Sequence, residues 1–163
     1  MNQGFEAVSL AVFFGALVVA VVAALRLGGG AERAGAILLL LMVAFRFATR
    51  ALQAPVFASV DPFGLATDLI GFGGFTWIGW HAKRYWPLWA AALQLLSLGG
   101  HFARFANYEV EPLVYAVMKS APTFLASIAL LTGTVLHWRR TRGSGRRASR
   151  PAYDGPKVSS ATR

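Results

Sequence analysis

Long apolar runs separated by short polar segments occupy most of this chain of 163 residues. Each run is close to the length of about 20 residues that an α-helix needs to cross about 30 Å of hydrocarbon. Only a helix or a closed barrel can satisfy its own backbone hydrogen bonds in lipid. We therefore predict an all-α membrane bundle of five transmembrane helices, at about residues 5–25, 35–54, 62–82, 87–106 and 113–138.

The composition agrees with lipid as the main solvent of the chain. Hydrophobic residues make up 56%, which is more apolar surface than a soluble domain of this size can hide in its core. Cysteine is absent, which excludes disulfides, thiolate metal sites and cysteine nucleophiles. No basic residue precedes the first run, and Glu6 stands at its start. We expect this run to be a retained first span rather than a cleaved signal sequence.

The positive charges predict how the chain is oriented. Twelve of the sixteen basic residues lie in the loop from Arg26 to Arg33, in the loop with Lys83 and Arg84, and in the tail after residue 138. The N-terminus and the connections 55–61 and 107–112 contain none. Because basic residues stay on the cytoplasmic side during insertion, we predict an outer N-terminus and an inner C-terminus. Five spans place the two termini on opposite sides of the membrane, as this orientation requires.

Interfacial and packing residues support the same spans. Proline at 62, 87 and 112 is expected in first helical turns, whereas Pro122 lies inside a span and predicts a kink or a local compensation. Five aromatic rings surround the third connection, as in a headgroup belt: Trp77, Trp80, Tyr85, Trp86 and Trp89. One face of the third span carries small residues that let another helix approach closely: Gly64, Asp68, Gly71, Phe75 and Gly79. The first span is nearly featureless and is expected at the periphery.

The candidate site is a cluster of polar groups, most of them in the outer half of the predicted bundle. Charged groups are costly there, so they should face one another or water. Balanced charge favours ion pairs that fix the helices. The alternative is an outward-facing pocket for an anionic lipid or a quinone-like ligand. The cluster consists of Arg46, Arg50, Asp68, Gln94, His101, Arg104 and Lys119.

Other activities have weaker support. A transporter needs polar groups at successive depths, and no carboxylate or base is predicted in the inner half, although an oligomer could build a pore. His101 and Asp68 could act as a base and its orienting acid, but neither a serine nucleophile nor metal-ligand spacing accompanies them. We therefore predict a non-enzymatic protein without a cofactor.

A weak internal repeat raises a further alternative. Residues 46–49 resemble 104–107, and 81–84 resemble 137–140, which would fit a parallel duplication of helices 2–3 and 4–5. It would place His81 and His137 at similar depth, and paired histidines can hold haem iron. Each histidine also adjoins two basic residues at an interface, where a solvated imidazole is ordinary.

After Trp138 the composition becomes rich in Arg, Ser, Gly and Pro, so the predicted transmembrane domain is 1–138 and 139–163 is expected to be a disordered basic tail. The tail could lie on anionic lipid or dock on an acidic partner. No nucleic acid is expected, because no aromatic residue interleaves the arginines.

The segment Arg84-Tyr85-Trp86-Pro87-Leu88-Trp89, followed by Gln94, His101 and Arg104, resembles that of small bacterial inner-membrane proteins of unassigned activity. The resemblance covers the last three spans and implies a helical bundle in that membrane, without an activity, a cofactor or a catalytic residue. We therefore expect a multi-pass inner-membrane protein that serves as an accessory or structural component. Its expected partners are membrane lipids and other membrane subunits or copies of itself.

Overall fold

The computed structural model describes residues 3–49, 61–105 and 112–148, and within these ranges the chain forms five helices and no strand. The fold is therefore all-α, as predicted. The helices are α1 (Gln3–Leu27), α2 (Gly30–Thr49), α3 (Pro62–Ala82), α4 (Trp86–Phe105) and α5 (Pro112–Ala148).

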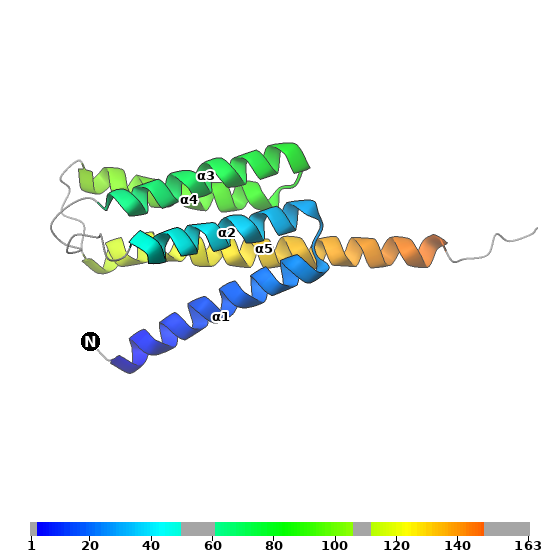
Figure 1. Cartoon of the computed structure of the whole chain (residues 1–163), viewed down its shortest axis with the longest axis horizontal. Coiled ribbons are helices and arrows are strands. Elements are labelled where there is room, and N and C mark those ends of the chain that lie inside the picture. Colours follow the sequence, from blue (N-terminus) through cyan, green and yellow to red (C-terminus); the bar gives the residue numbers. More distant parts are fainter. Residues whose placement is uncertain (1–2, 50–60, 106–111, 149–163) are drawn as a thin grey trace, which may run out of the picture.

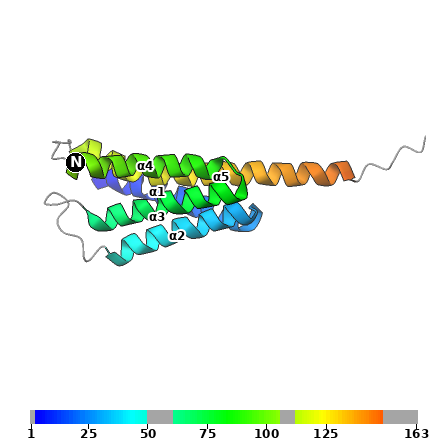
Figure 2. The same ribbon diagram turned by 90° about the horizontal axis from the view of Figure 1, so that it is seen from above.

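Successive helices run antiparallel and pack as a bundle (Figures 1 and 2). Neighbours in the bundle follow the order α1, α5, α4, α3 and α2, with α2 returning to α1. The short connections α1–α2 and α3–α4 lie at the end from which α5 projects, and the N-terminus of α1 lies at the opposite end (Figure 1). We call these the inner and outer ends. α1 crosses the others obliquely and contacts α5 and α2, so it is peripheral, as expected.

Local chemistry explains where the helices begin and end. The side chain of Asp61 caps α3 by accepting a hydrogen bond from the amide of Gly64 at 2.9 Å, and Pro62 fills the first turn. α3 ends where Lys83 adopts a left-handed conformation (φ 50°, ψ 45°). α2 begins at Gly30 rather than near residue 35, and its predicted end at 54 lies outside the described residues.

The end of α5 differs from the prediction. The helix continues to Ala148, so residues 139–148 are helical rather than disordered, and 149–163 lie outside the described residues. Once a helix is nucleated, adding residues costs little, and arginine is a good helix former near a C-terminus. The Thr141 hydroxyl donates to the carbonyl oxygen of Trp138 at 2.9 Å, and the Arg142 guanidinium lies 4.2 Å from the centroid of the Trp138 ring.

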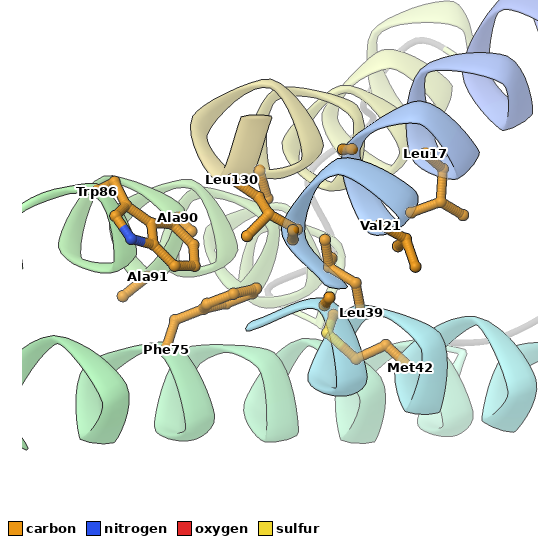
Figure 3. Close-up of a cluster of buried hydrophobic side chains, with 13 residues drawn as sticks. Leu17, Val21, Leu39, Met42, Phe75, Trp86, Ala90, Ala91 and Leu130 are labelled. Carbon is orange, nitrogen blue, oxygen red and sulfur yellow. The ribbon is translucent and has the colours of Figure 1, made fainter. Parts of the chain in front are cut away.

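Trp86 is the main wedge of the core rather than part of an exposed belt. Its indole is 8% exposed, and Cβ atoms added at Gly35 of α2 and Gly133 of α5 would both collide with it. Its ring meets Phe75 edge-on with centroids 6.2 Å apart (Figure 3). The other four aromatic residues of the predicted belt are exposed, Trp80 and Tyr85 by 80% and 84%. Gly35 and Gly133 therefore leave room for the indole of Trp86. Burial of this indole stabilises the fold by about 2–3 kcal/mol.

The predicted small-residue face of α3 is confirmed. Its buried residues are Gly64, Thr67, Asp68, Gly71, Phe75 and Gly79. Close approach accounts for the glycines, because a Cβ at Gly71 would meet Met42 of α2 and Gln94 of α4. The outward faces of the bundle carry Val, Leu, Ile, Phe and Trp on all five helices.

By length and apolar composition alone, two of the described helices could cross a membrane, α1 over Leu10–Leu27 and α5 over Ala121–Arg142. α2, α3 and α4 contain the ionisable and amide residues of the bundle interior, such as Glu32, Asp68 and Gln94, which lower their apolar content.

Substitution of the glycines that pack against Trp86 tests this arrangement. We expect Gly35→Ala and Gly133→Ala each to lower the free energy of unfolding by about 1–3 kcal/mol, because the added methyl overpacks the indole. The measurement is thermal unfolding in detergent micelles, followed by circular dichroism. Gly73→Ala and Gly99→Ala are the matched controls, since nothing lies within 4 Å of a Cβ there. They should be neutral or stabilising by up to about 1 kcal/mol. Equal effects at all four glycines would contradict the close packing of Trp86 against Gly35 and Gly133.

Candidate functional site

A buried hydrogen-bonded triad joins α3 to α4. Oδ2 of Asp68 accepts a hydrogen bond from the hydroxyl of Ser97 at 2.6 Å and lies 3.2 Å from Nε2 of His101. All three side chains are buried. Ser97 and His101 are four residues apart on α4, so they present their polar atoms on one face. The structure thus brings together two of the predicted site residues, Asp68 and His101, and adds Ser97 to them.

Gln94 extends this polar face by one turn toward the inner end. The side chain is 0% exposed, and neither Nε2 nor Oε1 has a hydrogen-bond partner among the described residues. Its Cδ lies close to Gly71 of α3, beside Met42 of α2. A buried amide without partners costs about 1–3 kcal/mol of stability. Gln94 therefore either destabilises the bundle or binds a small polar molecule.

Arg46 forms an ion pair at the outer end of the bundle. Its Nη1 lies 2.8 Å from Oδ2 of Asp61, the residue that caps α3. The pair therefore links the last turn of α2 to the first turn of α3. Arg50 lies outside the described residues, and the side chains of Arg104 and Lys119 are not among those described. Membership of these three in the cluster stays a prediction.

A second buried carboxylate lies at the inner end. Glu32 is almost completely buried, and its carboxylate accepts hydrogen bonds from the amide of Gly29 at 3.0 Å and from Nε1 of Trp86 at 3.2 Å. On the sequence alone Glu32 falls in a predicted loop, and its burial was not predicted. A usable signal was its position two residues after the last of three glycines, where a tight turn would bring the carboxylate back over its own helix start.

Basic groups surround the same inner site. Nη2 of Arg84 lies 3.1 Å from Nδ1 of His137, so the guanidinium donates and the ring nitrogen accepts. A Cβ added at Gly29 would lie 2.9 Å from Cε1 of His137 and 3.2 Å from Oε2 of Glu32, so Gly29 is enclosed by both side chains. We refer to Glu32, Trp86, His137 and Arg84 as the inner cluster.

The two histidines proposed for haem have separate surroundings. His81 is exposed, stacks on Trp77 of its own helix with ring centroids 3.8 Å apart, and its Nδ1 lies 3.0 Å from that residue's carbonyl oxygen. His137 belongs to the inner cluster. Among the described residues no set of three or more His, Asp or Glu side chains is arranged to hold a metal ion. The geometry gives the haem alternative no support.

Comparison of the chain with protein families, with curated proteins and with solved structures found no match.

The isolated amide of Gln94 predicts an unusual result for a core substitution. Gln94→Met keeps the volume and removes both unpaired polar atoms, so we expect the free energy of unfolding to rise by about 1 kcal/mol. Ser97→Ala is the matched polar deletion on the same face. It should lower the stability by about 1–3 kcal/mol, because Asp68 loses a donor. Thermal unfolding in micelles measures both. Destabilisation by Gln94→Met would show that the amide has a partner, such as bound water.

Proposed function

We propose that this chain is a non-enzymatic, multi-pass protein of the bacterial inner membrane, with all five helices crossing the bilayer. The distribution of side chains carries the proposal. Large apolar side chains cover the outside, including Val18, Leu41 and Phe102, whereas Glu32, Asp68 and Gln94 are buried. In water this distribution would expose a large apolar surface without a partner. In lipid the hydrocarbon covers the apolar side chains, while Glu32 and Asp68 find hydrogen-bond donors inside the bundle.

The proposed orientation has the N-terminus outside and the C-terminus in the cytoplasm. Exposed basic residues of the inner end support it: Arg26, Arg33, Lys83, Arg139, Arg140 and Arg142. Exposed Trp77, Trp80, Tyr85 and Trp89 surround the α3–α4 connection at the same end, where amphipathic rings prefer the headgroup layer.

Within this frame the polar groups of the outer half serve mainly to hold the helices together. Arg46 is engaged by Asp61, and Asp68 by Ser97 and His101, so these charges are satisfied within the protein. An anionic lipid or quinone-like ligand would have to compete with those partners. The pairing therefore favours a structural role for the cluster, and an accessory role for the protein among lipids and other membrane subunits. The exposed side of α1 is one of the apolar surfaces available to such a subunit.

Fusions of reporter enzymes to the two ends test the topology. A reporter that is active only outside the cytoplasm should work at the N-terminus and fail at the C-terminus, because an odd number of crossings separates them. A cytoplasmic reporter should give the reverse pattern. Activity of one reporter at both ends would contradict five spans.

A charge swap distinguishes ion pairing from ligand binding at Arg46. We expect Arg46→Asp to lower the amount of folded protein in membranes severalfold, because it leaves Asp61 facing a like charge. The double variant Arg46→Asp/Asp61→Arg restores an ion pair but loses the carboxylate that caps α3, so it should recover part of the loss. Size-exclusion chromatography and native lipid mass spectrometry measure both quantities. A co-purifying anionic lipid or quinone that both variants lose, without loss of folding, would favour the pocket instead.

A further inference from the structure

The side of α5 that is turned away from the bundle forms a continuous stripe along the helix. Its exposed residues are spaced alternately three and four apart, which keeps them on one face of a helix. The opposite face is buried and includes Leu130 and Thr134. In the membrane placement proposed above, the exposed face contacts lipid. The stripe begins with Leu125, Ile128, Thr132 and Val135.

Arginines continue this stripe without a change of register. Arg139 is four residues after Val135, and Arg142 is three residues after Arg139. Both side chains are exposed, and the helix extends past them to Ala148. Figure 1 shows this part of α5 projecting beyond the other four helices. The stripe therefore changes from apolar to basic on the same side of the helix.

The change occurs near the depth of the lipid headgroups. At a rise of about 1.5 Å per residue, Arg139 lies about 6 Å and Arg142 about 10 Å beyond Val135 along the axis. The polar layer of a bilayer is about 5–7 Å thick on each side of the hydrocarbon core. The long, flexible stem of an arginine can bridge the remaining few ångströms. Both guanidinium groups can therefore reach lipid phosphates.

The two guanidinium groups are prepared for an anion. The Arg142 guanidinium lies 4.2 Å from the centroid of the Trp138 ring, which restricts the arginine side chain. A guanidinium that stacks on a ring keeps its in-plane N–H donors for another acceptor. No described acidic side chain forms an ion pair with Arg139 or Arg142. A bound anion would therefore not have to displace such a partner.

We propose that Arg139 and Arg142 form a binding site for an anionic phospholipid of the inner leaflet. The proposal rests on the membrane placement given above, and it names the class of lipid and its place on the protein. Arginines three residues apart on a helix are neighbours, so they can donate to one phosphate or to the phosphates of two adjacent headgroups. The acyl chains of the lipid lie along the apolar part of the same stripe, from Leu125 to Val135.

The position of the arginines favours a lipid over an acidic protein as the occupant. They follow the lipid-facing side of α5 from its last apolar turn, whereas a protein from the cytoplasm could approach the projecting helix from any side. The tendency of basic residues to stay inside accounts for their presence at this end, but it does not require them to continue the register of the stripe. The helical form of residues 139–148 gives them a definite side, which a disordered tail would lack.

Native mass spectrometry of the full chain in detergent micelles tests the site. The micelles contain equal amounts of phosphatidylglycerol and phosphatidylcholine with identical acyl chains, so that only the headgroups differ. We expect the wild type to prefer phosphatidylglycerol by about tenfold, and Arg139→Gln/Arg142→Gln to prefer it by at most about twofold. Arg139→Lys/Arg142→Lys should keep much of the preference, because it keeps both charges.

Arg26→Gln/Arg33→Gln is the matched control. It removes two charges from exposed positions at the same end of the bundle, so it weakens the general attraction for anions to the same extent. The two residues belong to different helices and share no helix face. The preference should stay within about twofold of the wild-type value. An equal fall in both double variants would overturn the site.

Size-exclusion chromatography and circular dichroism check the folding of every variant, and Arg139→Gln alone serves if the double variant is unstable. Folded, detergent-dependent wild-type protein without a preference for phosphatidylglycerol overturns the lipid site only. Wild-type protein that stays folded and monodisperse without detergent contradicts the membrane placement itself. If the double variant keeps its phosphatidylglycerol but loses the binding of polyglutamate, the occupant is an acidic protein and the lipid site is wrong.

Discussion

The hydrogen bonds to the Asp68 carboxylate are the constraint on which the arrangement of the bundle depends. A carboxylate in an apolar interior is costly unless it is paired, and Ser97 and His101 supply its partners from the neighbouring helix. Satisfying them fixes the rotation of α3 and α4 about their axes. That rotation in turn directs Gly71 toward α2 and Gln94, and Phe75 toward Trp86, so the apolar core follows from a polar contact.

At the inner end a second buried carboxylate also holds helices together, but its hydrogen-bond donors are of a different kind. There the carboxylate of Glu32 binds a backbone amide and an indole, and the indole is held between two glycines on different helices. One side chain, Trp86, therefore joins α2, α4 and α5, and it does so through burial and a hydrogen bond together. Between the two carboxylates the interior is filled by apolar side chains, among them the buried Leu39, Phe75 and Leu130. The bundle is thus polar near both ends and apolar between Gln94 and Trp86.

Much of the fold could be predicted from the chain itself, because the length of an apolar run reports directly on a long helix. The buried face of α3 followed from the spacing of Gly64, Gly71 and Gly79, since small residues repeated on one side of a helix are typical of close packing against a neighbour.

Three features could not be predicted in this way. The burial of Glu32, next to the exposed Arg33, depends on Trp86, which is far away in sequence. Trp86 stands among four exposed aromatic residues, so composition alone assigns it to the interface, and only Gly35 and Gly133 reveal the space for it. The helical end of α5 is polar and contains glycine, a composition typical of disorder, yet it continues a helix that is already formed.

The length of α5 has a mechanical consequence. A single continuous helix runs from beside the outer polar groups to a point beyond the inner end, and Pro122 lies near its start. Gly133 of α5 is packed against Trp86, and from there to Ala148 the helix axis extends about 22 Å. The helix therefore holds Arg139, Arg140 and Arg142 in one fixed direction from the bundle, which an unstructured chain would not do.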